Sequence, residues 1–234
     1  TPGNINDLNL PQAQQKLAQR MARAGKPVTL VLVEGRPRLI SGFEDGMDAV
    51  VMGYLPGNRG GDAIANVLFG DVNPSGKLPF SYPKFPNARE TYDHKSTQQI
   101  GQSEQTAYNP QYPFGHGLSY TRFEYSGLQL SDTTMTPEGT IRVNVTVTNV
   151  GERKGKETVM MFVSDHYASV TPPVKRLKAF EKIDLEPGQS QKIVFEIHPE
   201  DLMFVGPNNK WILEDGEFSV MISDQKASFI LHKS

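Results

Sequence analysis

The chain has 234 residues, of which 37% are hydrophobic and 21% are charged, and this ordinary globular composition suits one large domain or two small ones. The 24 basic and 26 acidic residues leave a formal net charge of −2, so there is no single-sign field to attract nucleic acid or an anionic membrane, and we expect neither as a partner. The absence of cysteine excludes disulfides, thiolate metal sites and cysteine nucleophiles.

The first part of the chain has the pattern of an α/β layer. Residues 11–24 place Leu17 and Met21 four apart and end at glycine and proline, which predicts an amphipathic helix. Continuous apolar runs at 28–33 and 49–52 are typical of strands buried in a parallel sheet. A glycine-rich turn then precedes a second helix, on which Ile64, Val67 and Leu68 share one face.

Two strands and two helices form only half of a doubly wound layer, and their apolar faces would stay uncovered. We therefore expect the missing strands upstream of Thr1. The opening residues read as a loop without an initiator methionine, which also predicts that the true N-terminus lies elsewhere.

A polar, proline-punctuated connector follows the first domain. It contains Asp93, His94 and Lys95, three adjacent hydrogen-bonding residues that could meet a sugar, with a solvated loop as the competing interpretation. The other histidines lack metal-ligand spacing and the serines lack a GxSxG elbow, so we expect no metal, no cofactor and no serine hydrolase. Residues 57–61 lack the spacing of a phosphate-binding loop.

From Arg122 onward the pattern changes to that of strands. Apolar residues alternate strictly with polar ones at 141–147, and the alternation recurs at 159–163, 193–197 and 218–222. This predicts an antiparallel β-sandwich of the fibronectin or immunoglobulin type. The predicted fold is thus α/β followed by all-β: a partial α/β sandwich domain at 1–85, a connector at 86–120 and a fibronectin type III-like domain at 121–234.

Four stretches, in order, carry a resemblance to a known family. They are residues 25–37, which contain GKPV and EGRP; residues 55–79, which contain LPG and GDVNPSGKLP; residues 112–120, YPFGHGLSY; and residues 173–188, which contain PVKRLKAFEK and end in PG. Together they resemble glycoside hydrolase family 3 in its three-domain β-glucosidase form. The chain departs from the usual pattern at Arg59, where the family usually has an acidic residue, and at His116, where it often has an aromatic one.

The resemblance implies a retaining exo-β-glucosidase that acts on terminal β-linked glucosyl residues. Such an enzyme needs a nucleophile and a general acid/base about 5 Å apart. The family's nucleophile is an aspartate of an N-terminal (β/α)₈ barrel, and its acid/base is a glutamate in a loop ahead of the helix that begins here near Pro11. Asp7 is the only carboxylate between Thr1 and Pro11, so both catalytic residues are expected upstream of Thr1 and none in this chain.

The resemblance also implies partners and a location. We expect the N-terminal remainder of the same enzyme as a partner, a β-linked glucoside as the substrate, and a periplasmic or secreted location, with a homodimer left open. The chain alone is expected to be inactive.

Two alternatives remain open. The enzyme could be a β-xylosidase or have dual specificity, because the residues that choose the sugar would lie in the barrel. The chain could instead be a non-catalytic carbohydrate-binding or structural module, an interpretation based on the predicted sandwich and its aromatic residues Tyr167 and Trp211.

Overall fold

The computed structural model describes residues 7–86, 91–96 and 108–233. They form two compact units. Within the described residues, the first, here called the α/β unit, comprises 7–72, 78–86, 91 and 108–116. The second, the sandwich unit, comprises 73–77, 92–96 and 117–233. The predicted boundaries at 85 and 120 stay a prediction.

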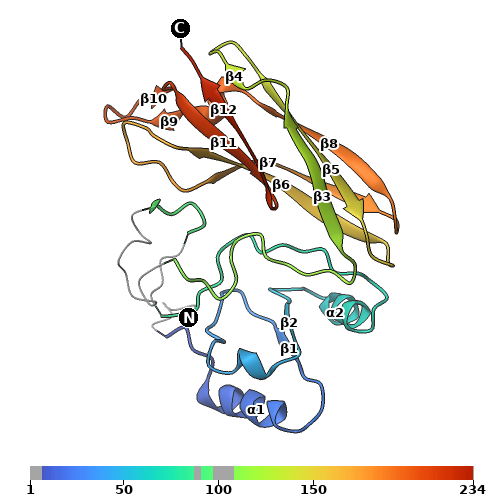
Figure 1. Ribbon diagram of the computed structural model, residues 1–234. Coiled ribbons are helices and arrows are strands. Elements are labelled where there is room, and N and C mark those ends of the chain that lie inside the picture. Colours follow the sequence, from blue (N-terminus) through green and yellow to red (C-terminus); the bar gives the residue numbers. More distant parts are fainter. Residues whose placement is uncertain (1–6, 87–90, 97–107, 234) are drawn as a thin grey trace. The chain divides into compact units, whose positions relative to one another are not determined.

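The α/β unit contains the helices and strands expected from its sequence (Figure 1). In chain order these are α1 (Gln12–Ala22), β1 (Thr29–Leu32), β2 (Ala49–Met52) and α2 (Gly60–Leu68). A 3₁₀ turn, η1 (Glu44–Gly46), which the sequence did not predict, lies between β1 and β2. Strands β1 and β2 pair in parallel, with Thr29 opposite Ala49 and Leu32 opposite Met52. In the described part of the chain no further strand pairs with either of them.

The core of the α/β unit is small. Its buried members are Leu32, Ile40, Phe43 and Tyr82, and Ala18 of α1 packs against them. The two large residues of the helix are not covered, because Leu17 is 61% and Met21 is 47% exposed. The expectation that this half-layer leaves apolar surface uncovered is therefore confirmed.

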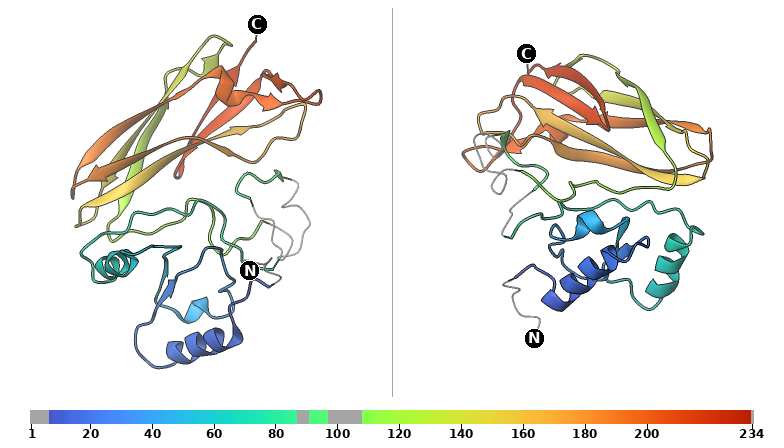
Figure 2. Two further views of the ribbon diagram at one scale, coloured as in Figure 1. Left: turned by 180° about the vertical axis from the view of Figure 1, so that it is seen from behind. Right: turned by 60° about the horizontal axis from the view of Figure 1, so that its bottom comes forward.

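The sandwich unit has two main sheets, whose strands run from green to red in Figures 1 and 2. One sheet has the order β4-β12-β11-β6-β7 and the other the order β3-β5-β8. The strands are β3 (Phe123–Leu130), β4 (Thr134–Met135), β5 (Ile141–Asn149), β6 (Gly155–Asp165), β7 (Arg176–Leu185), β8 (Ser190–Ile197), β11 (Gly216–Ile222) and β12 (Gln225–Leu231). The short helix α3 (Pro199–Leu202) precedes a ribbon of β9 (Phe204–Val205) and β10 (Trp211–Ile212).

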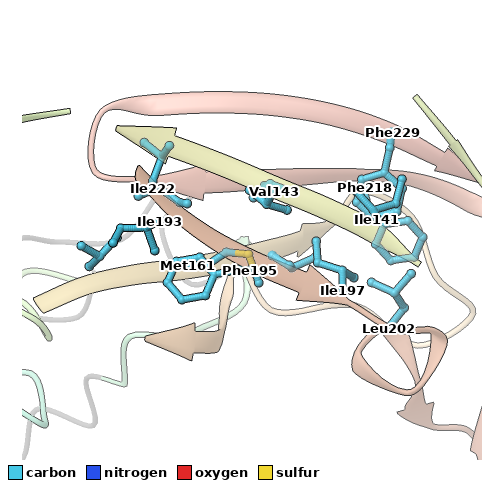
Figure 3. Close-up of a cluster of buried hydrophobic side chains, with 14 of the residues drawn as sticks. Ile141, Val143, Met161, Ile193, Phe195, Ile197, Leu202, Phe218, Ile222 and Phe229 are labelled. Atoms are coloured by element: carbon cyan, nitrogen blue, oxygen red, sulfur yellow. The ribbon is translucent and has the colours of Figure 1, made fainter. Parts of the chain in front are cut away.

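The sandwich core lies between the two sheets, where alternate residues of the facing strands meet (Figure 3). On β5, for example, Ile141, Val143, Val145 and Val147 are buried, and the residues between them are not. All four segments that alternate in the sequence are strands, namely β5, β6, β8 and β11. A stacked pair of rings, Phe218 and Phe229, adds to the core at a centroid distance of 5.5 Å.

The described parts of the connector are not a free loop. Residues 111–116 run antiparallel to 78–82 within the α/β unit, with the Leu78 amide donating to the His116 carbonyl at 2.8 Å and the Tyr82 amide to the Tyr112 carbonyl at 2.8 Å. Residues 92–96 belong to the sandwich unit instead. None of the helices described is both long enough and apolar enough to span a bilayer.

Candidate functional site

A buried tyrosine organises the polar centre of the α/β unit. The Tyr82 hydroxyl donates to the Arg38 carbonyl at 2.6 Å and lies 3.2 Å from Glu34 Oε1. The Arg38 amide donates to the same carboxylate oxygen at 3.1 Å. Burial, reinforced by the Glu34 charge, raises the pKa of Tyr82 well above its ordinary value, so the phenol stays neutral.

This centre fixes the segment that precedes α1. Arg38 Nη1 donates to the Asp7 carbonyl at 3.0 Å, and the Leu39 amide donates to the Leu8 carbonyl at 2.9 Å. Asn9 and Leu39 form an isolated parallel bridge. The backbone of residues 7–9 is therefore held by the residues that follow the EGRP motif, a network that the sequence alone did not reveal because its partners are about 30 residues apart or more.

The Asp7 carboxylate is held by its neighbour Asn9. Its Oδ1 accepts hydrogen bonds from the Asn9 amide and from Asn9 Nδ2, each at 2.8 Å. These bonds, with a smaller contribution from the Arg38 charge, lower the pKa of Asp7. That Asp7 is not the acid/base stays a prediction.

The candidate residues Asp93, His94 and Lys95 lie on the sandwich unit. His94 is buried, and its carbonyl accepts from the Val174 amide at 2.9 Å. Lys95 pairs with Pro173 as an isolated bridge, and its ammonium donates to the Thr171 carbonyl. These contacts give His94 and Lys95 a packing role on the sandwich, and a position near substrate stays a prediction for all three residues.

The NPSGKLP motif, at residues 73–79, holds two parts of the sandwich unit together. Asn73 Nδ2 donates to the Lys154 carbonyl at 3.0 Å, and Asn73 Oδ1 accepts from Ser119 Oγ at 3.0 Å and from the Tyr120 amide at 2.8 Å. Both hydrogen-bonding ends of one side chain are thus used. The motif resembled a family signature in the sequence, and the structure gives its asparagine a structural function.

Lys77 of the same motif forms a largely buried ion pair. Its ammonium lies 3.2 Å from Glu157 Oε1 and donates to the Gly117 carbonyl at 2.8 Å, and the Tyr125 hydroxyl lies 3.2 Å from the same Glu157 oxygen. Gly117 must be glycine here, because a Cβ would sit 2.1 Å from the Gly76 carbonyl oxygen. The residues 73–77 and 117–120 therefore form a clasp on β6, here called the Asn73–Lys77 clasp.

The two departures from the family pattern are accommodated locally. Arg59 pairs with Asp62 at 3.0 Å, and both side chains are well exposed, so the pair adds little stability. The His116 ring stacks on Tyr112 at a centroid distance of 4.9 Å, as an aromatic side chain would.

Other constellations in the described residues do not make a reactive site. No group of three or more histidine or acidic residues there could hold a metal ion. His166 Nε2 lies 2.7 Å from Ser219 Oγ and Glu217 lies 3.6 Å from the other ring nitrogen, a set that suggests a triad. Ser219, however, is completely buried and could not reach a substrate.

A pocket of about 250 Å³ opens in the sandwich unit. It lies beside the ends of β6 and β7, α3 and the β9–β10 ribbon, and Trp211 is part of its lining. Its charged residues are Lys95, Asp165, Arg176, Lys178 and Asp201. Apart from Lys95 and Trp211, sequence reasoning did not single these residues out, because they are spread over more than 100 positions.

Comparison with known proteins gives the chain its family. The model described as "Glycosyl hydrolase family 3 C-terminal domain" matches residues 3–120, and the model described as "Fibronectin type III-like domain" matches residues 157–226. The chain belongs to glycosyl hydrolase family 3. Its fold is the family's α/β C-terminal domain followed by a fibronectin type III-like sandwich, as the sequence predicted.

The similar family 3 proteins include beta-glucosidases and beta-xylosidases. The chain is 40% identical to a periplasmic beta-glucosidase of Salmonella typhimurium, over 94% of this chain and 30% of that protein. It is 38% identical to a beta-xylosidase of Formosa agariphila, over 94% of this chain and 31% of that protein. The solved structure of a beta-glucosidase from Listeria innocua in complex with glucose matches with a TM-score of 0.93 and 30% identity, over 98% of this chain and 34% of that one. The chain thus spans about a third of the length of the relatives it matches.

Proposed function

We propose that this chain is the C-terminal portion of a retaining exo-β-glucosidase that hydrolyses terminal non-reducing β-D-glucosyl residues. In this role it completes the α/β domain and braces the active site. The catalytic nucleophile and acid/base belong to the polypeptide upstream of Thr1, and the chain alone is inactive. The similarity to β-glucosidases over nearly the whole chain, at about a third of their length, supports this assignment.

The observation that supports the proposal is the incomplete parallel sheet formed by β1 and β2. In the described residues β1 has one parallel partner, β2, and the other edge of β1 is unpaired. A groove of about 450 Å³ runs beside β1 and α1, and its lining includes Leu17, Met21 and Val33, all of them exposed. A parallel sheet is normally covered on both faces and continued by further strands. We infer that upstream strands of the same enzyme continue the sheet and cover this surface.

The bracing role rests on the Glu34, Arg38 and Tyr82 network. It fixes the backbone of residues 7–9 through the Arg38 side chain and the Leu39 amide. Because residues 7–9 are fixed, the loop that leads into them has less conformational freedom. Positioning of this kind matters because catalytic groups lose rate when they are displaced by about 1 Å.

A β-xylosidase is the second candidate function. It is favoured by the similarity to a beta-xylosidase of Formosa agariphila at 38% identity. The residues that would choose between glucose and xylose belong to the upstream polypeptide under this proposal. We further propose a periplasmic or secreted location, which is supported by the periplasmic relative.

The test is a comparison of two proteins, the 234-residue chain and the same chain extended upstream to the start of its open reading frame. Each is assayed with aryl β-D-glucopyranoside and aryl β-D-xylopyranoside at matched concentrations. We expect no hydrolysis by the 234-residue chain and hydrolysis of the glucoside, with retention of anomeric configuration, by the extended protein. A higher kcat/KM for the xyloside would select the second candidate.

Two results would overturn the proposal. Hydrolysis by the 234-residue chain at the rate of the extended protein would mean that the catalytic residues lie within it. A folded extended protein that hydrolyses neither substrate would remove the enzymatic assignment.

A further inference from the structure

The pocket of about 250 Å³ in the sandwich unit combines an apolar wall with charged groups of both signs. The wall is formed by Val163, Leu202 and Phe218, which belong to the sandwich core. Phe218 and Leu202 are labelled at one end of that core in Figure 3. A concave site with an apolar base and a few convergent polar groups is the usual form of a small-molecule site.

The charged groups in the pocket are only partly satisfied. Asp165 Oδ1 accepts from the Tyr167 amide at 3.1 Å, and Asp201 Oδ2 accepts from the His198 amide at 2.9 Å. The second oxygen of each carboxylate has no hydrogen-bond partner among the described residues. The Arg176 guanidinium, which is half-buried, also has no hydrogen-bond partner among the described residues. These positions are therefore available for hydrogen bonds to a ligand in the pocket.

Trp211 supplies an aromatic surface at the same place. It is the only tryptophan in the sequence, it is 65% exposed, and it lines the pocket from β10, whose partner in the ribbon is β9. An aromatic ring so exposed on a short ribbon contributes little to the core. Such rings are used at sites where a ligand presents an apolar face and a polar edge.

We propose that this pocket binds one ring of a neutral carbohydrate, with the ring face on Trp211 and the hydroxyl groups hydrogen-bonded to Asp165 and Arg176. Neighbouring hydroxyls both donate and accept, so one sugar can satisfy a carboxylate and a guanidinium together. The mixture of carboxylates and cations argues against a simple anion or cation as the ligand. The volume, slightly below the range of about 300–1,000 Å³ for drug-sized ligands, suits a single ring.

The proposal concerns binding and stands whether or not the whole protein hydrolyses glucosides. It is tested on the full 234-residue chain with methyl β-D-glucopyranoside and cellobiose as probes. Trp211 is the only indole, so its fluorescence reports directly on the pocket. We expect a saturable change in emission with a dissociation constant on the order of 1 mM, the range expected of a small ligand with few contacts.

Variants then assign the binding to named groups. Asp165→Asn and Arg176→Gln should each raise the dissociation constant about tenfold or more, a change that corresponds to the loss of one hydrogen bond to a charged group. Phe180→Ala is the matched control, because Phe180 is 67% exposed and is not part of the pocket lining. Its affinity should equal that of the wild type.

Trp211→Ala provides a second route if either charge variant fails to fold, and its binding is measured by ligand-detected NMR instead of fluorescence. We expect the NMR signal of binding to be lost in this variant. Three results would overturn the proposal: no saturable response in the folded wild-type chain, equal affinity in the pocket variants and the wild type, or binding of inorganic phosphate in place of sugar.

Discussion

At the residue scale, the ion pair between Lys77 and Glu157 shows how a motif residue stabilises the sandwich unit. Both side chains are largely buried, and Glu157 also faces the Tyr125 hydroxyl. A buried charge that loses its partner costs more than the pair contributes, because the remaining charge is left desolvated. This asymmetry allows a test that separates the ion pair from simple loss of volume.

We predict that Lys77→Met lowers the free energy of unfolding of the sandwich by about 3 kcal/mol. The double variant Lys77→Met, Glu157→Leu should lose less than Lys77→Met alone, because no charge is left unpaired. Urea unfolding followed by Trp211 fluorescence measures both.

The matched control is Arg142→Met, which breaks the exposed pair of Arg142 and Glu196 at 3.1 Å. Its loss should be at most about 1 kcal/mol. If both variants lost the same free energy of unfolding, the Lys77 charge would contribute no stability, and only the apolar part of its side chain would matter.

Asn149 offers a second test at the same scale. It is completely buried, its Oδ1 accepts from Thr121 Oγ1 at 2.7 Å, and its Nδ2 donates to the Arg153 and Leu185 carbonyls at 2.8 and 3.0 Å. Asn149→Asp keeps the shape but replaces the donor with an oxygen that faces two carbonyl oxygens. We predict a loss of about 2–4 kcal/mol at neutral pH, again measured by urea unfolding.

Asn144→Asp on the same strand is the control for Asn149→Asp. Asn144 has no hydrogen bond from its side chain among the described residues, so this variant should change stability by less than about 0.5 kcal/mol. If Asn149→Asp were as mild as Asn144→Asp, the assigned direction of the Asn149 amide would be wrong.

At the element scale, the strands and helices with a regular period could be predicted, and the strands without one were harder to recognise. Strand β2 has the predicted bounds, and β5, β6, β8 and β11 follow the alternation of the sequence. The alternation of β7 is weaker, because its pairing with β6 shifts register between Met161 and Phe162. Bulges break the period of two on which such predictions depend. The β9–β10 ribbon is too short to have a period at all.

The exposed face of α1 gives a prediction for this scale. Leu17→Lys should change the stability of the 234-residue chain by less than about 0.5 kcal/mol, because Leu17 is already exposed. In the protein extended upstream, the same change should destabilise the α/β domain by about 1.5–3 kcal/mol, the amount that a buried leucine contributes. Hydrogen exchange of the α1 amides measures both.

Gln19→Lys adds the same charge to a residue of α1 that is exposed and lies outside the groove lining. It should be neutral in both proteins. A Leu17→Lys variant that is equally neutral in the extended protein would mean that upstream residues do not cover α1, contrary to the proposed function.

At the scale of the whole molecule, the buried tyrosines predict how stability depends on pH. Burial raises the pKa of Tyr82 in the α/β unit, and burial with the nearby Glu157 charge raises the pKa of Tyr125 in the sandwich unit. In the unfolded chain both ionise near pH 10. Because the folded pKa is the higher one, their stabilising contribution is complete below about pH 10 and is lost as the pH rises above it.

We predict that the free energy of unfolding falls above pH 10 by about 1.4 kcal/mol per pH unit for each tyrosine that stays protonated in the folded state. Tyr125→Phe should make this fall shallower for the sandwich unit, and Tyr82→Phe should do so for the α/β unit. The prediction is checked by tyrosinate absorbance and urea unfolding between pH 9 and 11, about one unit on either side of the ordinary tyrosine pKa. Burial lowers the pKa of Lys175 and Lys178, an effect of opposite sign that is common to wild type and variants and cancels in the comparison. A variant that falls in parallel with the wild type would contradict the prediction.

The candidate site was less predictable than the fold. The spacing of apolar residues in the sequence indicates which side chains are buried, and this was enough to predict most of the helices and strands. The pocket and the Glu34–Arg38–Tyr82 network join residues that are distant in sequence, and no period marks them. Asp93, His94 and Lys95 were noticed because they are adjacent and polar, but the contacts of His94 and Lys95 with residues 171–174 could not be read from their own segment.

The Asn73–Lys77 clasp limits how the sandwich unit can be exchanged between related proteins by gene fusion. Among the described residues, segments 73–77 and 92–96 belong to the sandwich unit, although residues 78–86, 91 and 108–116 on either side of them along the chain belong to the α/β unit. A gene fusion with a single junction, for example one that begins at residue 121, would carry the strands of the sandwich without Asn73 and Lys77, which bind them. Exchange of the sandwich between relatives should therefore succeed only when the donor supplies the interleaved segments as well, so the two units are expected to be inherited together.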